Sequence, residues 1–306
     1  MFETLEQTLV HVNIAAQKIP GLAGAMRAAS FLGVETFYFA LVPALFWLFS
    51  RRAALELLLM IIATAYTNSI LKWVFSRPRP YWISDSVQAL AEETTYGIPS
   101  GHAQNAVVVW FMLAVFAVRK WPNRKTAIYG VAAFIVALIS FARIYLGVHF
   151  IEDIVAGWLF GSILLALYLR FHKPMEEWWR VSPARVGVVL VPVVLLWFAF
   201  KVRTLSPGSF SDRGPLSLAT VISTQGSLLG LIIVFLIPVV SFQPHLRMRI
   251  VLLVATLAIV LGLQVGLTKL FAPYTHMEME FRFIRYFLVC IVGFLLIPWS
   301  AKKLLS

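Results

Sequence analysis

Long runs of apolar residues, separated by short polar or basic loops, dominate the sequence. A helix needs roughly 17 to 25 consecutive apolar residues to cross the hydrocarbon core of a bilayer. Runs of about that length occur at residues 33–50, 53–75, 102–118, 126–143, 150–170, 185–203, 217–240, 248–270 and 282–300. The pattern predicts an all-α protein, a polytopic bundle of about nine transmembrane helices.

The composition agrees with this prediction and excludes a soluble domain. Of the 306 residues, 60% are hydrophobic and 13% are charged. The mean hydropathy is +0.84, which is far outside the range of soluble domains. The single cysteine, Cys290, lies inside an apolar run, so a disulfide framework and a cysteine-based metal site are excluded.

Basic residues are distributed unevenly between the two sides of the predicted bundle. When alternate loops are assigned to opposite faces, one face carries 14 of the 26 lysines and arginines but only 3 of the 14 acidic residues. Because cytoplasmic loops collect Lys and Arg, that face is predicted to be cytoplasmic, with the N-terminus outside and the C-terminus inside. Topology therefore explains the net charge of +12. Since no basic helix or repeat appears, no nucleic-acid partner is expected.

The residues before the first apolar run differ in character from the rest. They begin with acidic side chains and lack the basic start and unbroken apolar stretch of a signal peptide. Phe2, Leu5, Leu9 and Val12 recur at helical spacing, which predicts a short amphipathic helix lying on the membrane surface. The chain is expected to divide into this interfacial segment at 1–32, a transmembrane core at 33–184 and additional C-terminal helices at 185–306.

Two cations occur where the second apolar run ends, in the sequence LKWVFSRPRPY. Lys72 precedes the helix-breaking Pro78 and Pro80, so it is expected within the span or at its edge, where a charge is usually functional. Arg79 lies between the two prolines. Taken alone, the pair would more simply be explained as long side chains that anchor a helix end at the membrane interface.

The segment YGIPSGHAQN, residues 96–105, opens the third apolar run. Ser100 offers a hydroxyl, Gly101 a flexible backbone and His102 an imidazole, beside the free N–H groups of a helix start. Such a place can hold an anion. The segment alone is equally well explained as an ordinary helix start, with Ser100 as the N-cap and Pro99 fixing the turn.

A third cluster lies between the fourth and fifth runs and contains Arg143, His149 and Asp153. His149 and Asp153 are four residues apart, so on a helix they would share a face and the carboxylate could accept a hydrogen bond from the imidazole. That contact would fix the tautomer and leave the other ring nitrogen free as a nucleophile or base. A structural polar pair is the alternative explanation.

All three clusters fall on the predicted outer face. Lys72, Arg79 and Arg143 around helix-end N–H groups suit a phosphoryl dianion, and His149 and His102 suit a nucleophile and an acid for the leaving group. The sequence contains no carboxylate cluster or histidine triad typical of a metal site. Neither a metal nor a cofactor is expected.

The ordered set K-x6-R-P, P-S-G-H and R-x5-H-x3-D resembles the signature of the type 2 phosphatidic acid phosphatase (PAP2) superfamily, over about residues 72–153. Lipid phosphate phosphatases, glucose-6-phosphatase and the soluble vanadium haloperoxidases belong to that superfamily. The resemblance implies a haloperoxidase-like helical core, followed here by additional C-terminal helices. Nine spans with an outside N-terminus also resemble the layout of glucose-6-phosphatase.

The resemblance further implies a role for each motif residue. His149 would be the nucleophile that forms a phosphohistidine, Asp153 its orienting partner and His102 the general acid. The phosphoryl group would be held by Lys72, Arg79, Ser100, Gly101 and Arg143. The family usually has Ser before the arginine of its third motif, whereas this chain has Ala142, so one hydroxyl contact is absent.

The leading hypothesis is a metal-independent phosphatase, integral to a bacterial inner membrane, that hydrolyses a lipid phosphomonoester or diphosphate on the periplasmic face. Undecaprenyl diphosphate, phosphatidic acid, phosphatidylglycerophosphate, a sphingoid phosphate and a soluble sugar phosphate all remain open as substrates. A phosphotransferase that passes the phosphoryl group to a lipid or sugar acceptor is the first alternative. A carrier or scaffold that only binds anionic lipid is a remote one. The sequence leaves the oligomeric state undetermined.

Overall fold

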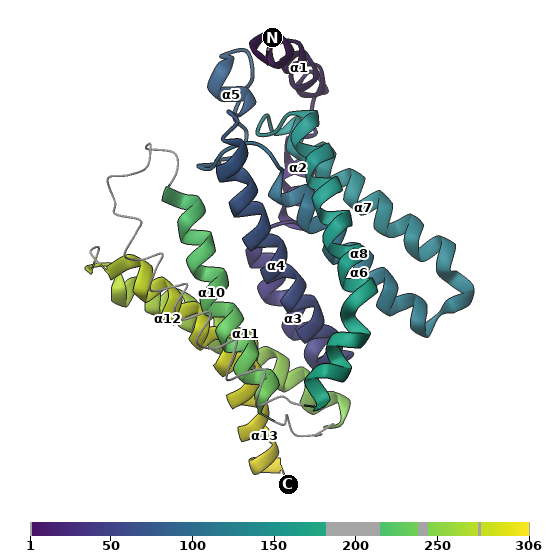
Figure 1. Ribbon diagram of the computed structural model, residues 1–306, viewed down its shortest axis with the longest axis vertical. Coiled ribbons are helices and arrows are strands. Elements are labelled where there is room, and N and C mark those ends of the chain that lie inside the picture. The colour runs from purple at the N-terminus through teal and green to yellow at the C-terminus, as the bar shows by residue number, and fades with distance from the viewer. Residues whose placement is uncertain (1, 182–214, 238–243, 275–276, 306) are drawn as a thin grey trace. The chain divides into compact units, whose positions relative to one another are not determined.

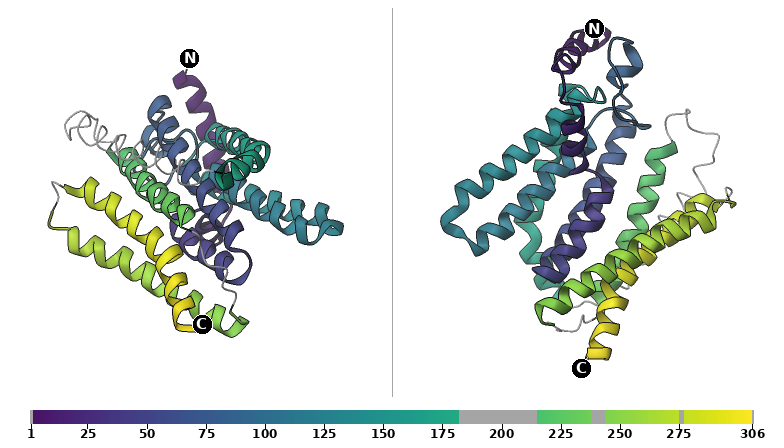
Figure 2. Two further views of the ribbon diagram at one scale, coloured as in Figure 1. Left: turned by 60° about the horizontal axis from the view of Figure 1, so that its bottom comes forward. Right: turned by 180° about the vertical axis from the view of Figure 1, so that it is seen from behind.

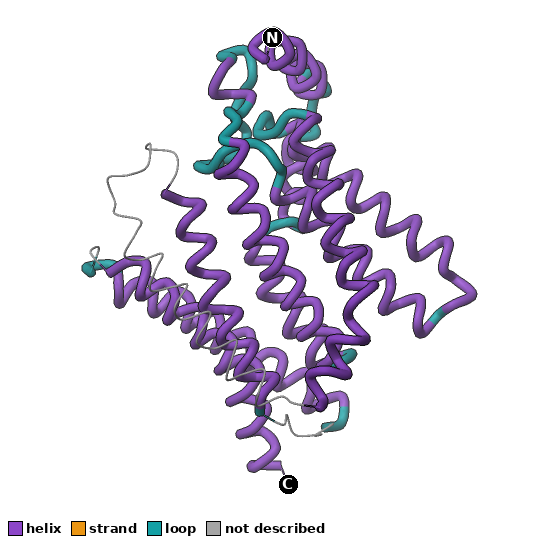
Figure 3. The backbone as a smooth tube through the Cα atoms, in the orientation of Figure 1, coloured by secondary structure: helices purple, strands orange, loops and turns teal. Residues whose placement is uncertain are grey.

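The structure is a computed structural model, and it describes residues 2–181, 215–237, 244–274 and 277–305. Every regular element among these residues is helical (Figure 3). The all-α prediction is therefore confirmed. The run predicted at 185–203 lies outside the described residues, so the count of nine spans stays a prediction.

The helices follow the predicted order along the chain. They are α1 (Phe2–Gln17), α2 (Ala23–Phe31), α3 (Glu35–Leu48), α4 (Arg51–Phe75), α5 (Pro80–Ile83), α6 (Gly101–Lys120), α7 (Lys125–Tyr145), α8 (Ile151–Val181), α10 (Pro215–Leu236), α11 (Leu246–Phe271), α12 (Glu278–Ile291) and α13 (Ile297–Leu305). A 3₁₀ turn, η1 (Pro122–Arg124), precedes α7, and a π-helical turn, η3 (Val292–Leu296), joins α12 to α13.

Among the described residues, 7 helical segments are long and apolar enough to cross a membrane. The run predicted at 33–50 is corrected by the structure, because α3 covers only Glu35–Leu48 and meets α2 at a bend of 49°. If the bent pair forms one span, the number rises to 8. Gly33 lies at the bend, where a Cβ would come within 2.8 Å of the His102 ring. The bend therefore coincides with a close approach of the backbone to a predicted site residue.

The chain forms two compact units. The first comprises Met1–Tyr38, Ala63–Leu169 and Ser211–Ser217, and the second comprises Phe39–Ile62, Arg170–Phe210 and Leu218–Ser306. In the first unit α6 and α7 form an antiparallel hairpin (Figures 1 and 2), and α2 packs against α7. Its core includes Ala103, Ala142, Leu146, Val148 and Ile154. Burial of such apolar side chains stabilises the folded state by about 25 cal/mol for each Å² of apolar surface removed from water.

The second unit is held by close packing among α10, α11 and α12. Its core includes Ile222 and Ile232 of α10 with Phe283 of α12. The two helices approach so closely that a Cβ on Gly230 would lie 2.7 Å from Cβ of Cys290. Cys290 is buried in this contact, which agrees with its position in an apolar run.

Helix α1, which was predicted only to lie on the membrane surface, also makes hydrogen bonds to the end of α7 and to the loop that follows it. The buried Asn13 side chain donates hydrogen bonds to the carbonyls of Ile144 (2.9 Å) and His149 (3.0 Å). Gln17, one turn later, donates to Tyr145 O at 3.0 Å. Phe2 and Leu5 lie outside the described side chains, and the placement of α1 on a membrane surface stays a prediction. The described contacts show that α1 fastens the loop between α7 and α8.

We predict that Asn13→Ala destabilises the protein by about 2 kcal/mol, because two buried carbonyls lose their donor. Thermal unfolding of the purified protein in detergent, followed by tryptophan fluorescence, measures the effect. His11→Ala is the control, since His11 is an exposed residue of the same helix. Equal melting temperatures for the two variants would contradict this role of Asn13.

Candidate active site

His149 lies in the loop between α7 and α8 and contacts Asp153 in the first turn of α8. Its Nδ1 is 2.9 Å from Asp153 Oδ2, and both side chains are buried. The expected contact is present, but its geometry differs from the expectation, since His149 precedes the helix. Asp153 Oδ2 also accepts the backbone N–H of Phe150 at 3.0 Å. The carboxylate thus caps the start of α8 while it orients the imidazole.

Arg79 supplies the second contact of the His149 ring. Its Nη1 lies 3.2 Å from His149 Nε2 and donates to Val148 O at 2.7 Å. A guanidinium can only donate, so Nε2 must accept and, in the neutral ring, Nδ1 must carry the proton. Nδ1–H then donates to Asp153. The contacts therefore select the tautomer in which Nε2 presents its lone pair.

The electrostatics favour the same neutral ring. Burial and the neighbouring cations Arg79 and Lys72 lower the pKa of His149 well below its ordinary value. A charged imidazole would also be repelled by Arg79, Lys72 and Arg143. His149 is consequently neutral at physiological pH, the state in which a ring nitrogen can attack phosphorus.

The other side of Arg79 is held by the loop that precedes α6. Its Nε donates to Thr95 O at 2.6 Å, and Nη2 donates to Thr95 Oγ1 at 3.2 Å and to Tyr96 O at 3.1 Å. The side chain is fully buried. Arg79 directly precedes Pro80, the first residue of α5, and its backbone is extended, as is usual for a residue before proline. The RPRP sequence thus turns this side chain inward.

Lys72 is in the last turn of α4 and is buried, as the sequence predicted. Its Nζ donates to Gly97 O at 3.1 Å and makes a short hydrogen bond with Tyr96 O. Gly97 has no room for a side chain, because a Cβ would lie 2.9 Å from Pro78 O and 3.1 Å from Asp153 Oδ2. The loop at residues 95–97 therefore accepts hydrogen bonds from both Lys72 and Arg79.

Arg143 occupies the last turn of α7 and is also buried. Its Nη1 donates to the Ser30 hydroxyl of α2 at 2.7 Å. Its Nη2 pairs with Glu93. The preceding Ala142, which replaces the serine usual in the family, is completely buried in the core.

Glu93 joins two of the cations, and the sequence did not single it out. One carboxylate oxygen pairs with Arg143 Nη2, and the other lies 3.3 Å from Arg79 Nη2. Burial would raise the pKa of Glu93, but Arg143 and Arg79 outweigh it and hold the pKa at about 2. Glu93 is one of two adjacent acids in a polar loop. No periodicity distinguishes it from its exposed neighbour Glu92, because its partners come from distant parts of the chain.

The start of α6 is built around Ser100. Its hydroxyl accepts the backbone N–H of Ala103 at 3.4 Å, and its own N–H donates to Asp153 O at 2.9 Å. At Gly101 a Cβ would lie 3.1 Å from Asn68 Oδ1. Asn68 in turn donates to Pro99 O at 3.2 Å. Ser100 is thus the N-cap, and its backbone joins the first turn of α6 to the first turn of α8.

His102, one residue into α6, faces the α2–α3 bend at Gly33. Its buried Nε2 has no hydrogen-bond partner among the described residues. An unsatisfied buried polar atom is rare in a native fold and often has a chemical role. No group of three or more metal-binding side chains is present in the described part of the chain.

The structure brings the predicted residues together in two connected groups. Asp153, His149 and Arg79 form a chain of contacts, and Arg79, Glu93 and Arg143 form a second one. Lys72, Ser100 and Gly101 border the same loop and helix start. His102 is adjacent through α6, although its Nε2 is not bonded to the other site residues.

Comparisons with known proteins identify relatives over part of this chain. Residues 53–176 match the model of the PAP2 superfamily. Lipid phosphate phosphatase delta from Arabidopsis thaliana is 32% identical over 46% of this chain and 36% of its own length. Phosphatidylglycerophosphatase B from Bacillus subtilis is 29% identical over 52% of this chain and 79% of its own length.

A solved structure shares the fold. It is the crystal structure of a transmembrane PAP2-type phosphatidylglycerolphosphate phosphatase from Bacillus subtilis, with 29% identity and a TM-score of 0.50. The match covers 56% of this chain and 87% of that one. The chain therefore carries a PAP2 superfamily domain at residues 53–176.

Proposed function

We propose that the protein is a phosphatase that hydrolyses a lipid phosphate through a phosphohistidine at His149, without a metal ion. The observation that carries the proposal is the position of the His149 ring between Asp153 Oδ2 and Arg79 Nη1. This arrangement holds the ring in one tautomer and one orientation, as a nucleophile requires. The named activities of the relatives support the same reaction class.

In the first step, His149 Nε2 attacks phosphorus and the bond from phosphorus to the ester oxygen breaks. Arg79 Nη1, which occupies the Nε2 lone pair in the structure, moves its hydrogen bond to a phosphoryl oxygen. The ester oxygen takes a proton from His102 and leaves as the alcohol. Asp153 stabilises the positive charge that the imidazole acquires.

In the second step, water attacks the phosphohistidine. The bond from Nε2 to phosphorus breaks, His149 returns to its neutral form and inorganic phosphate is released. His102 accepts the proton from the attacking water, which restores it as an acid for the next cycle. His102 Nε2 suits both transfers because it is buried and has no partner among the described residues.

The transferring phosphoryl group is stabilised by charge and by backbone N–H groups. Lys72, Arg79 and Arg143 supply three positive charges, and Ser100 and Gly101 begin α6, whose N-terminal amides favour an anion. Glu93 accepts hydrogen bonds from Arg79 and Arg143 in the structure. We propose that a phosphoryl group displaces Glu93 from these arginines when it binds.

The substrate class proposed is a lipid that carries a terminal phosphate or diphosphate. Apolar helices flank the site in sequence, and the relatives named above act on lipid phosphates according to their names. Loop charge supports a site on the outer face, with the N-terminus outside and the C-terminus cytoplasmic. We propose that this face is the periplasmic face of a bacterial inner membrane.

We expect His149→Ala to lower phosphate release by at least about 10³-fold, since the nucleophile is lost. A screen of phosphatidic acid, phosphatidylglycerophosphate, undecaprenyl diphosphate, a sphingoid phosphate and a sugar phosphate in detergent measures the rate and ranks the substrates. His11→Ala should keep the full rate, since His11 is exposed on α1. Release that survives in His149→Ala would disprove the phosphohistidine.

Metal independence is tested on the same preparation. A chelator such as EDTA should leave the rate unchanged, because the proposed charge stabilisation comes entirely from protein cations and amides. A rate that falls with chelator and returns with Mg²⁺ would contradict the proposed mechanism. Vanadate should inhibit by occupying the phosphoryl position.

His102→Ala should slow hydrolysis of a lipid alcohol ester by about 10²- to 10⁴-fold, the usual contribution of a general acid. The loss should be much smaller for a nitrophenyl phosphate, whose leaving group needs no proton. Comparing the two substrates separates proton donation from structural support. Equal losses on both substrates would remove His102 from the role of acid.

Glu93→Gln should lower stability near neutral pH, because the paired carboxylate is replaced by a neutral group. The folded pKa of about 2 lies below the unfolded value of about 4.3. The stabilisation is therefore fully present above about pH 4.3 and is lost as the pH falls toward 2. Melting temperatures of wild type and variant should converge as the pH is lowered. Glu92→Gln is the control, since Glu92 is exposed, and a constant difference at all pH values would refute the pairing.

A further inference from the structure

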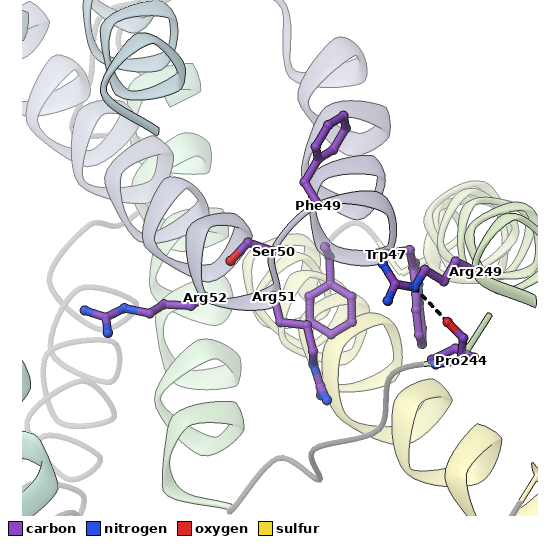
Figure 4. Close-up of a pocket in the computed structure, with 8 residues that line it drawn as sticks. Trp47, Phe49, Ser50, Arg51, Arg52, Pro244 and Arg249 are labelled. Atoms are coloured by element: carbon purple, nitrogen blue, oxygen red, sulfur yellow. Dashed lines mark hydrogen bonds between the residues drawn. The ribbon is translucent and has the colours of Figure 1, made fainter. Parts of the chain in front are cut away.

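A second basic site lies in the other compact unit, at the turn between α3 and α4. A cavity of about 290 Å³ is bordered there by the end of α3, the start of α4 and the start of α11 (Figure 4). Three arginines line it, Arg51, Arg52 and Arg249. Arg51 begins α4, whereas Lys72 of the active site is in the last turn of that helix. At 1.5 Å per residue, about 30 Å of helix separates them, so the cavity is not part of the active site.

The charge of the cavity is positive. Among the described residues that line it there is no carboxylate. Glu56 pairs with Arg52 from one turn further along α4, at 2.8 Å from Arg52 Nε. Arg249 Nε donates to Pro244 O at 2.8 Å, the bond drawn in Figure 4. A guanidinium has five N–H donors, and toward the described residues the Arg249 side chain uses one of them. The cavity is built to attract an anion.

Membrane topology alone does not account for this arrangement. Cytoplasmic arginines normally extend into water, as Arg124 and Lys125 do, both being exposed. Arg51 and Arg249 are instead partly buried and border one cavity. The Arg51 guanidinium lies over the Phe46 ring, 4.9 Å from its centroid, which fixes its position at the wall.

The walls of the cavity are aromatic and rigid on one side. Phe46 and Trp47 are buried, and Trp47 Nε1 donates to Thr256 Oγ1 of α11 at 2.9 Å. Phe49, in contrast, is 70% exposed at the rim. Lining arginines beside an exposed aromatic side chain match a phosphate attached to an apolar tail better than they match a small inorganic ion. Basic pockets between helices on the cytoplasmic side bind lipid headgroups in other membrane proteins.

The helix starts reinforce the attraction. Ser50 caps α4, accepting the N–H of Ala53 at 3.2 Å. Arg249 lies in the first turn of α11, which begins at Leu246. The amides of both first turns carry partial positive charge. They add to the positive field of the arginines.

We propose that this cavity binds a phosphate-bearing anion on the face that loop charge predicts to be cytoplasmic. An acidic phospholipid headgroup and a soluble phosphate are the two sources of that chemistry. The ligand is retained and not hydrolysed, because the described lining residues include no histidine, carboxylate or thiol that could act as a nucleophile or a base, and the one hydroxyl, that of Ser50, caps α4. The binding site is independent of the activity proposed for His149.

The test is a binding titration of the full-length protein in a neutral detergent. One arm uses short-chain phosphatidylglycerol, a phosphodiester, and the other uses inorganic phosphate. The titrations are run on the wild type and repeated in His149→Ala, and the Arg249 variants described below separate binding in the cavity from binding at the active site. Saturable binding of either probe in both backgrounds is expected, and the arm with the tighter binding identifies the source. Absence of saturable binding in both arms overturns the proposal.

The arginines are tested with variants of matched charge. Arg249→Gln should weaken binding by about tenfold, as loss of a charge-assisted hydrogen bond to phosphate does, and Arg52→Gln/Arg249→Gln should weaken it further. Arg124→Gln/Lys125→Gln removes the same charge from exposed positions on the same predicted face and should stay within about twofold of wild type. Equal weakening in both double variants would show bulk electrostatics and overturn the site.

Folding of the variants is checked by melting temperature and by phosphate release. Arg249→Lys keeps the charge and should retain part of the affinity even if Arg249→Gln is destabilised. If Arg249→Lys is folded and binds no better than Arg249→Gln, the contribution of charge at this position is refuted.

Discussion

The burial of three cations at one helix-end cluster is the constraint on which the rest of the site depends. Lys72, Arg79 and Arg143 are each at most 7% exposed. A buried charge is tolerated only when it is paired or hydrogen-bonded. The fold meets this requirement with one carboxylate, Glu93, with main-chain carbonyls and with the hydroxyls of Ser30 and Thr95. The arginines and the lysine are therefore held in place by the fold itself.

The loop between α5 and α6 supplies most of the hydrogen-bond acceptors for these cations. Thr95, Tyr96 and Gly97 turn their carbonyls toward Arg79 and Lys72, and Glu93 reaches both arginines. Carbonyl acceptors fix the direction of a cation without cancelling its charge. The loop consequently orients the cations while leaving their positive field available to an anion. A flexible loop of the same composition could not supply this preorganisation.

The same cations decide the state of His149. Together with burial they lower its pKa well below the ordinary value, while Asp153 and Arg79 fix the tautomer. Asn13 of α1 fastens the backbone of His149 from outside the PAP2 domain. Residues far apart in the chain thus converge on one nitrogen atom. Because these residues are far apart in the sequence, only the fold shows that they meet.

The sequence by itself determined the all-α membrane architecture, because apolar runs of bilayer length admit few other structures. It also determined the motif residues, since K-x6-R-P, P-S-G-H and R-x5-H-x3-D have fixed internal spacings. It located Lys72 at a helix end and Ser100 at a helix start correctly, because prolines and capping residues act locally.

Only the tertiary structure decided how these pieces meet. The bend at Gly33, the bridge made by Glu93 and the hold of Asn13 on His149 all join residues that are distant in the chain. Such contacts depend on how helices pack, which no local pattern encodes. The contact of His149 with Asp153 was expected from helical spacing, yet it arises because Asp153 caps α8. Local rules therefore fixed which residues were available, and packing fixed their partners.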